Sequence, residues 1–231
     1  MNWKTIKDNR YFYPALYILI LALFIALPHF TRPYTTILLS SIFMYIAMTL
    51  SWAFFSGPTG YTSLATAAFF GIGLYTAGIL GSNVPLAVVV ICGGLISFVL
   101  AFLIGAITLR LRGIYFAIFT FGLVELIKHL MLWWEINIVG VRGRFVMRAD
   151  NTTVFYILVA ILVALLLATY FLKRSRYGMA LAGIGSCEEA AIHIGVNVTN
   201  LKIITFASSA FFIGLTGAIM ATRWSYIDPY I

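Results

Sequence analysis

Charged residues are scarce in this chain: they make up 10% of its 231 residues, whereas hydrophobic residues make up 62%. A soluble domain of this size does not need so much apolar sequence, so the composition excludes an ordinary soluble fold. Apolar runs of about 20 residues match the ~30 Å hydrocarbon layer of a bilayer. These runs are continuous instead of alternating, which excludes a lipid-facing β-barrel. The sequence therefore predicts an all-α, polytopic helical membrane protein.

Cysteine and histidine are scarce as well. Cys92 falls in an apolar run and Cys187 in a polar segment, so neither a disulfide framework nor a metal cluster is implied. His29, His129 and His193 fall at three different predicted depths, which gives no metal-binding or catalytic constellation. Because no cluster of nucleophile and base is found either, we expect no catalytic residue, no metal and no cofactor, and not an enzyme.

Two further motifs are missing. There is no G-x-x-x-x-G-K-[ST] phosphate loop, so the chain itself is not expected to bind or hydrolyse ATP. No small-x-small cleavage site follows the first apolar run, which favours an uncleaved first span over a removable signal peptide. The net charge of +8 comes from basic residues dispersed around the ends of apolar runs, a pattern typical of membrane topology and not of nucleic-acid binding.

The chain is predicted to form one transmembrane domain with about seven helices. The expected spans cover residues 13–30, 34–55, 62–80, 85–109, 114–134, 153–172 and 201–222. All six prolines fall at or beside the ends of these spans, where a missing backbone donor costs least. With the N-terminus in the cytoplasm, most of the 15 lysines and arginines lie on the cytoplasmic side, as the positive-inside rule requires.

This orientation places the most polar segment, residues 173–200, in the cytoplasm. Ser186 precedes Glu189 by three residues, so the two side chains can cap the start of a short helix reciprocally, and Gly195 can end it. The helix would carry one small apolar face, suited to a groove on another protein, made by Cys187, Ala190, Ala191 and Ile194.

An alternative is that this helix rests on the membrane surface through Ile184, Ile192 and Val196. Docking on a protein is favoured because Glu188 and Glu189 would be repelled by an anionic leaflet and could instead pair with basic residues of a partner.

The third span begins with the irregular sequence GPTGYTS at residues 57–63. Its glycines and proline break regular helix, and irregular backbone at membrane depth survives only against protein or a water-filled cavity. The candidate pathway residues are therefore Gly60, Tyr61, Thr62 and Ser63, with an ordinary interfacial turn as the alternative.

Glu125 lies near the middle of the fifth span, where an isolated charge is expensive. Lys128 and His129 follow at i+3 and i+4 and can partly neutralise it. The group is either a polar site beside a pathway or a structural pair between helices.

Small residues recur at i+4 in three spans and predict close helix packing, or else a face that lines a path. They are Ser63, Ala67 and Gly71 in the third span, Gly93, Ser97, Ala101 and Gly105 in the fourth, and Ala210, Gly214 and Ala218 in the seventh.

Three segments together resemble one family of membrane proteins. They are GYTSLATAAFFGIGLYTAGIL at 60–80, LRLRGIYFAIFTFGLVELIKHL at 109–130, and the region 174–221, which contains EEAAIHIGVN. In this order they are similar to the inner-membrane permease subunits of ABC importers for branched-chain amino acids, the LivM-like branch, which includes urea and short-amide relatives. The family continues with further membrane helices, so the resemblance also implies a chain shortened at its C-terminus.

The resemblance implies a subunit that forms half of a translocation pathway for a branched-chain or other small amino acid. Its partners would be a second permease subunit, cytoplasmic ATP-binding subunits and an extracytoplasmic solute-binding protein, assembled in the lipid of the plasma (inner) membrane. The residues expected to couple it to the ATPase are Ser186, Glu188, Glu189, Ala190, Ala191 and Gly195. A self-contained secondary transporter of a small polar solute is the alternative.

Overall fold

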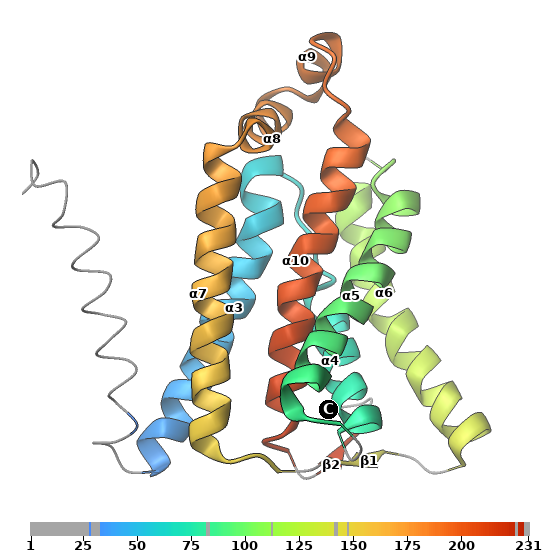
Figure 1. The fold of residues 1–231 in the computed structure, drawn as a ribbon. Coiled ribbons are helices and arrows are strands. Elements are labelled where there is room, and N and C mark those ends of the chain that lie inside the picture. Colours follow the sequence, from blue (N-terminus) through green and yellow to red (C-terminus); the bar gives the residue numbers. More distant parts are fainter. Residues whose placement is uncertain are drawn as a thin grey trace, which may run out of the picture.

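The computed structural model describes residues 28, 33–81, 84–111, 113–140, 143–146, 148–224 and 226–228. Long helices run between two ends of the molecule, with α8 and α9 at one end and the strands β1 and β2 at the other (Figure 1). In chain order the elements are α3 (Pro33–Thr59), α4 (Thr66–Leu80), α5 (Leu86–Thr108), α6 (Ile114–Trp134), the π-helix η1 (Glu135–Val139), β1 (Arg144–Phe145), α7 (Asn151–Arg174), α8 (Arg176–Ser186), α9 (Glu188–His193), α10 (Val198–Ala221) and β2 (Tyr226–Ile227). The two short strands pair antiparallel.

Five of the described helices are long and apolar enough to cross a membrane: α3, α5, α6 with η1 as far as Ile138, α7 and α10. They confirm the predicted all-α polytopic class. The predicted span at 13–30 lies outside the described residues, and the predicted span at 62–80 is replaced by the 15-residue helix α4. The number of seven spans therefore stays a prediction.

Helix α10 forms the centre of the bundle, with α4 and α5 on one side and α3 on another. Small residues allow this close approach. A Cβ atom added to Gly73 would overlap the Gly214 carbonyl, and one added to Gly93 would overlap Ala218. The packing role predicted for the small residues of the fourth and seventh spans is confirmed by these contacts.

The prediction that the small residues of the third span pack against another helix is wrong for Ala67 and Gly71. Within α4 the residue packed on α10 is Gly73, whereas Gly71 has nothing within 4 Å of an added Cβ and Ala67 is exposed. Ala67 and Gly71 instead line a pocket, described below.

An extended stretch, residues 60–65, separates α3 from α4 and runs beside α10 (Figure 1). The predicted break begins later than expected, because Gly57 and Pro58 still belong to the last turn of α3 and Gly60 is the first residue outside it, with φ of +71°. Side chains satisfy the freed backbone groups: Trp52 Nε1 donates to the Ser63 carbonyl at 2.9 Å, and the Leu64 amide donates to Thr120 Oγ1 at 3.0 Å. Irregular backbone is thus held against protein, as membrane depth requires.

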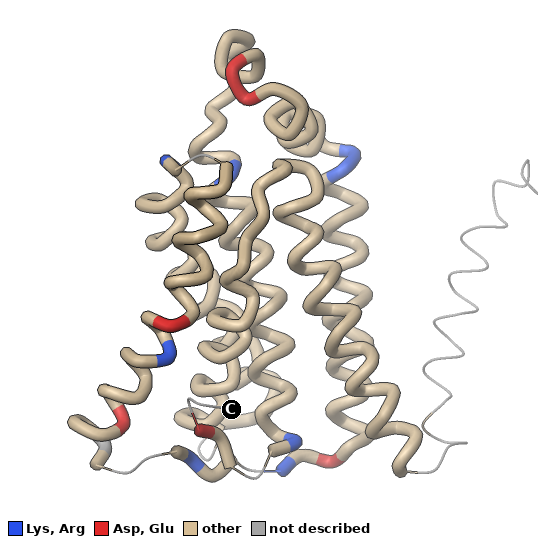
Figure 2. The backbone as a smooth tube through the Cα atoms, turned by 180° about the vertical axis from the view of Figure 1, so that it is seen from behind, with Lys and Arg blue, Asp and Glu red and all other residues tan. Residues whose placement is uncertain are grey.

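Charged residues gather at the two ends of the bundle (Figure 2). In the described spans, the charged residues far from a helix end are Glu125 and Lys128, both on α6.

Candidate functional site

The polar segment between α7 and α10 folds into two helices where one was predicted. Ser175 caps α8, its hydroxyl accepting a hydrogen bond from the Gly178 amide at 3.2 Å. The helix then continues through Ser186, whose hydroxyl donates to the Ala182 carbonyl at 3.0 Å. The predicted cap by Ser186 is therefore wrong: because Ser186 is still helical, its hydroxyl bonds back to the preceding turn. Helix α9 starts after Cys187 without a side-chain cap.

Gly195 terminates α9, as predicted. Its φ is +85°, and its amide donates to the Ile192 carbonyl at 3.0 Å, while the Val196 amide donates to the Ala191 carbonyl at 3.1 Å. This pair of bonds is the Schellman motif, which needs a left-handed residue and so favours glycine.

The predicted apolar face of α9 is divided between two sides. Ala191 is buried and packs with Leu181 and Val198. Ala190 is exposed, and Ile194 has 80% of its surface exposed. Only the exposed side is open to a partner.

Glu188, expected to point away from the protein, instead faces inward. Its Oε1 lies 3.0 Å from Nζ of Lys202, which is 1% exposed, and its Oε2 accepts a hydrogen bond from the Tyr61 hydroxyl. Lys202 Nζ also donates to the Tyr61 hydroxyl at 3.2 Å and lies 4.2 Å from the centre of its ring. We call Tyr61, Glu188 and Lys202 the anchor cluster.

The anchor cluster joins three elements that are distant in sequence: α9, the extended stretch and α10. It brings one predicted coupling residue, Glu188, together with one predicted pathway residue, Tyr61. A second contact lies close by, where a Cβ added to Gly185 of α8 would overlap the Pro58 carbonyl. Lys202 was missed by sequence reasoning, because it is the second residue of the predicted span 201–222, where a basic residue usually marks topology.

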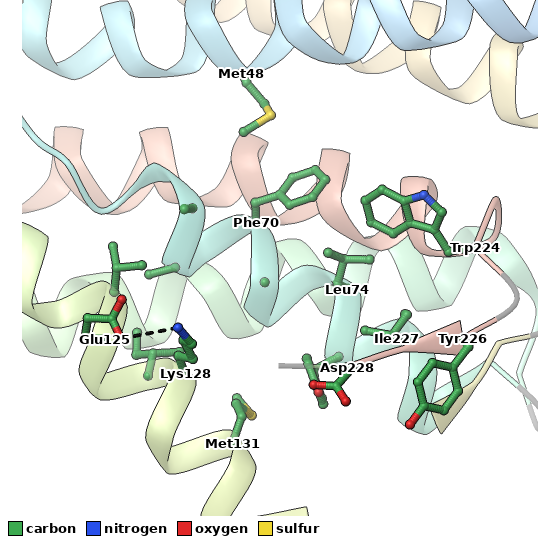
Figure 3. A pocket seen from close by; sticks show the side chains of 16 residues that line it. Met48, Phe70, Leu74, Glu125, Lys128, Met131, Trp224, Tyr226, Ile227 and Asp228 are labelled. Carbon is green, nitrogen blue, oxygen red and sulfur yellow. Dashed lines mark ion pairs between the residues drawn. The ribbon is translucent and has the colours of Figure 1, made fainter. Parts of the chain in front are cut away.

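The other candidate residue, Glu125, lies far along α6 and lines a pocket of about 350 Å³ between α3, α4, α6 and the segment after α10 (Figure 3). The predicted pairing is confirmed: Glu125 Oε2 lies 3.5 Å from Lys128 Nζ and 3.8 Å from His129 Nε2. Glu125, Lys128 and His129 all belong to α6. The predicted residues 60–63 are absent from this lining.

A buried polar group adjoins the pocket at the β1–β2 end. Glu135, the first residue of η1, is 0% exposed, and its Oε2 accepts a hydrogen bond from the Gly143 amide at 3.0 Å. Tyr75 belongs to the pocket lining, and its hydroxyl interacts electrostatically with the Glu135 carboxylate. Neither the Tyr75 hydroxyl nor Glu135 Oε1 makes a hydrogen bond of ordinary geometry. Sequence reasoning missed both residues, because Glu135 was assigned to a loop and Tyr75 to a membrane span.

A family model described as "Branched-chain amino acid transport system / permease component" matches residues 34–231. The high-affinity branched-chain amino acid transport system permease protein LivM of Salmonella typhimurium is 27% identical over 229 residues, covering 80% of this chain and 52% of the relative. LivM of Escherichia coli is 24% identical over 266 residues, covering 99% of this chain and 61% of the relative. The chain thus spans between about half and three fifths of these relatives. No solved structure matches it.

Proposed function

Because the chain is a multi-pass membrane protein that belongs to the branched-chain amino acid transport permease family, we propose that it is a permease subunit of an ABC importer. It forms half of a translocation pathway for a branched-chain or other small amino acid in the plasma (inner) membrane. Its partners are a second permease subunit, cytoplasmic ATP-binding subunits and an extracytoplasmic solute-binding protein. The α8–α9 end faces the cytoplasm, as the distribution of basic residues favours.

The observation that carries the coupling part of this proposal is the anchor cluster. A buried charge pair is costly to separate, because each ion would be left without its partner in a medium of low dielectric constant. Glu188 therefore ties α9 to Lys202 of α10 and, through Tyr61, to the extended stretch. When an ATP-binding subunit moves α9, these two membrane elements move with it.

The exposed side of α9 is the proposed contact for that subunit. It presents Glu189, Ala190 and Ile194. The alternative, in which this segment rests on the lipid surface through Ile184, Ile192 and Val196, is weakened because Ile184 is only 3% exposed. Glu189, which is exposed on this side of α9, is the acid proposed to meet basic groups of the partner.

The extended stretch is proposed to line the pathway. Thr62 is exposed and Leu64 is 47% exposed, although both belong to irregular backbone between two membrane helices. Such a surface is unsuited to lipid and requires either water or a second protein subunit. Both are supplied at an interface between two permease halves that encloses a pathway.

Uptake of labelled leucine into proteoliposomes tests the proposal. The chain is reconstituted with its partner subunits, and we expect uptake that requires ATP and the solute-binding protein and that persists when ionophores collapse the ion gradients. A nonhydrolysable ATP analogue is the matched control and should give no uptake. A secondary transporter would behave in the opposite way: uptake without ATP, abolished by the ionophores, would overturn the proposal.

A further inference from the structure

The junction of α7 and α8 is basic. Lys173 and Arg174 end α7, and Arg176 begins α8 after the single residue Ser175. All three basic side chains are exposed, and within the described part of the chain no acidic side chain forms an ion pair with any of them. We call Arg174 and Arg176, which flank Ser175 directly, the basic corner. Figure 2 shows this charge at the junction, with acidic residues beyond it on α9.

The backbone of the basic corner is held rigidly. The Ser175 hydroxyl donates to the Leu172 carbonyl at 2.7 Å and accepts a hydrogen bond from the Gly178 amide at 3.2 Å. A Cβ atom added to Gly178 would overlap the Leu172 carbonyl, so the first turn of α8 lies directly against the end of α7. Leu181 and Ile184 of α8 are buried, which fixes this helix to the rest of the protein. The two arginines are thus placed before any ligand arrives, which lowers the entropy cost of binding.

The helix ends at the junction do not neutralise its charge. The C-terminus of α7 carries a partial charge of about −0.5 and the N-terminus of α8 one of about +0.5, so the two largely cancel where they meet. The three basic side chains therefore leave an excess of about three positive charges at the corner. Such a concentration of charge attracts an anionic partner.

The direction of Arg174 indicates which partner that is. Its guanidinium carbon lies 5.0 Å from the centre of the Tyr170 ring, one turn back along α7 and about 6 Å closer to the middle of the span. Tyr170 is 51% exposed and Phe171 66% exposed, so the last turns of α7 present an aromatic surface of the kind found at a membrane interface. Arg174 therefore directs its charge toward the lipid and not toward the space beyond the bundle.

We propose that the basic corner binds the headgroup phosphate of an anionic phospholipid. The guanidinium groups of Arg174 and Arg176 hold the phosphate, for which planar guanidinium donors are well suited, and the acyl chains lie along the outer side of α7 at Tyr170 and Phe171. The bound lipid fixes the junction of α7 and α8 at the membrane surface. The same anionic surface repels the acidic helix α9, which stays available to a protein partner. This lipid site is independent of the proposed contact on α9.

Native mass spectrometry of the full chain, purified in a non-ionic detergent, tests the proposal. The chain is titrated with phosphatidylglycerol and with phosphatidylcholine carrying the same acyl chains, and we expect phosphatidylglycerol to bind more tightly. Equal binding of the two lipids would overturn the proposal. Glycerol 3-phosphate, which has the phosphate without acyl chains, is the third probe and should bind far more weakly. If it binds as tightly as the lipid, the corner is a site for a soluble phosphate and the proposal is wrong.

Variants at exposed positions locate the lipid. Arg174→Gln and Arg176→Gln should each weaken binding of phosphatidylglycerol about fivefold, the contribution of one basic residue near an anionic surface. Arg174→Lys keeps the charge and should bind like the original chain.

Arg110→Gln is the matched control, because it removes the same charge from an exposed residue that follows α5, and it should leave binding unchanged. Equal losses in Arg110→Gln and Arg174→Gln would show that binding follows net charge and not the corner. Unchanged lipid binding by Arg174→Gln, together with lost copurification of the ATP-binding subunits, would assign the corner to a protein partner and reject the proposal.

Discussion

Glu188→Gln is the change that most directly tests the anchor cluster. It keeps the size of the side chain and an acceptor oxygen but removes the negative charge 3.0 Å from Lys202 Nζ. Lys202 is 1% exposed, so its ammonium would remain buried without a counter-charge. Breaking a buried ion pair from one side costs about 3 to 5 kcal/mol. The Tyr61 ring, 4.2 Å from Nζ, offsets part of this, so we expect a loss at the lower limit, about 3 kcal/mol.

Removing the other member of the pair, with Lys202→Met, should lower the free energy of unfolding by less. The Glu188 side chain is 19% exposed, so it keeps contact with water as well as the hydrogen bond from Tyr61, while methionine fills the space of the lysine stem. We expect about 1 to 2 kcal/mol, similar to the loss of one hydrogen bond to a charged group. In the double variant no unpaired buried charge remains, so its stability should return to within about 1 kcal/mol of the original chain.

Reversible unfolding in mixed micelles of a mild detergent and dodecyl sulfate measures these free energies. Lys173→Met is the matched control, because Lys173 is exposed in the last turn of α7 at the end of the bundle, and its replacement should change stability by less than about 1 kcal/mol. Equal losses for Glu188→Gln and Lys173→Met would refute the burial argument.

Transport separates a structural role of the cluster from a coupling role. The double variant should be stable yet take up leucine poorly, because α9 is no longer joined to α10 by charge. If it is stable and transports normally, the cluster only stabilises the fold.

Two further changes test other contacts. Ala190→Arg, on the exposed side of α9, should prevent copurification with the ATP-binding subunits without lowering the free energy of unfolding. Thr199→Arg, which is exposed in the first turn of α10, is the control. Unchanged copurification of Ala190→Arg would contradict the proposed contact. Gly73→Ala should destabilise the chain by about 1 to 3 kcal/mol, because the added methyl overlaps the Gly214 carbonyl. Gly71→Ala is the control in the same unfolding assay: its added methyl has no neighbour within 4 Å, so the change should be neutral or slightly stabilising.

Hydropathy predicted the spans well because a membrane helix is specified by one simple property, about 20 consecutive apolar residues. The helices α7 and α10 begin and end within a few residues of the predicted 153–172 and 201–222. Hydropathy gave a wrong span for residues 62–80. Apolar sequence there includes an extended stretch whose backbone is satisfied by Trp52 and Thr120, two residues from other helices that no local pattern reveals.

The candidate site was predictable only in part, for a similar reason. Spacing located α9 and its terminal Gly195, because caps are local. Spacing could not show that Glu188 turns inward, since that depends on Lys202 and on Tyr61, 127 positions away from Glu188. Basic residues near span ends usually mark topology, and Lys202 stands at the start of the predicted span 201–222, so its burial was not foreseen.

The two sites lie at opposite ends of α10, and this placement follows from its packing. Lys202 is in the second turn of the helix, and Trp224 and Asp228, which line the pocket, follow its last turn. A helix of 24 residues is about 36 Å long and does not shorten under load without losing backbone hydrogen bonds. Because Gly214 packs backbone to backbone against Gly73, α4 cannot slide freely along α10. We therefore expect a displacement of α9 that moves Lys202 to move α4 as well, and with it Tyr75 on the lining of the pocket.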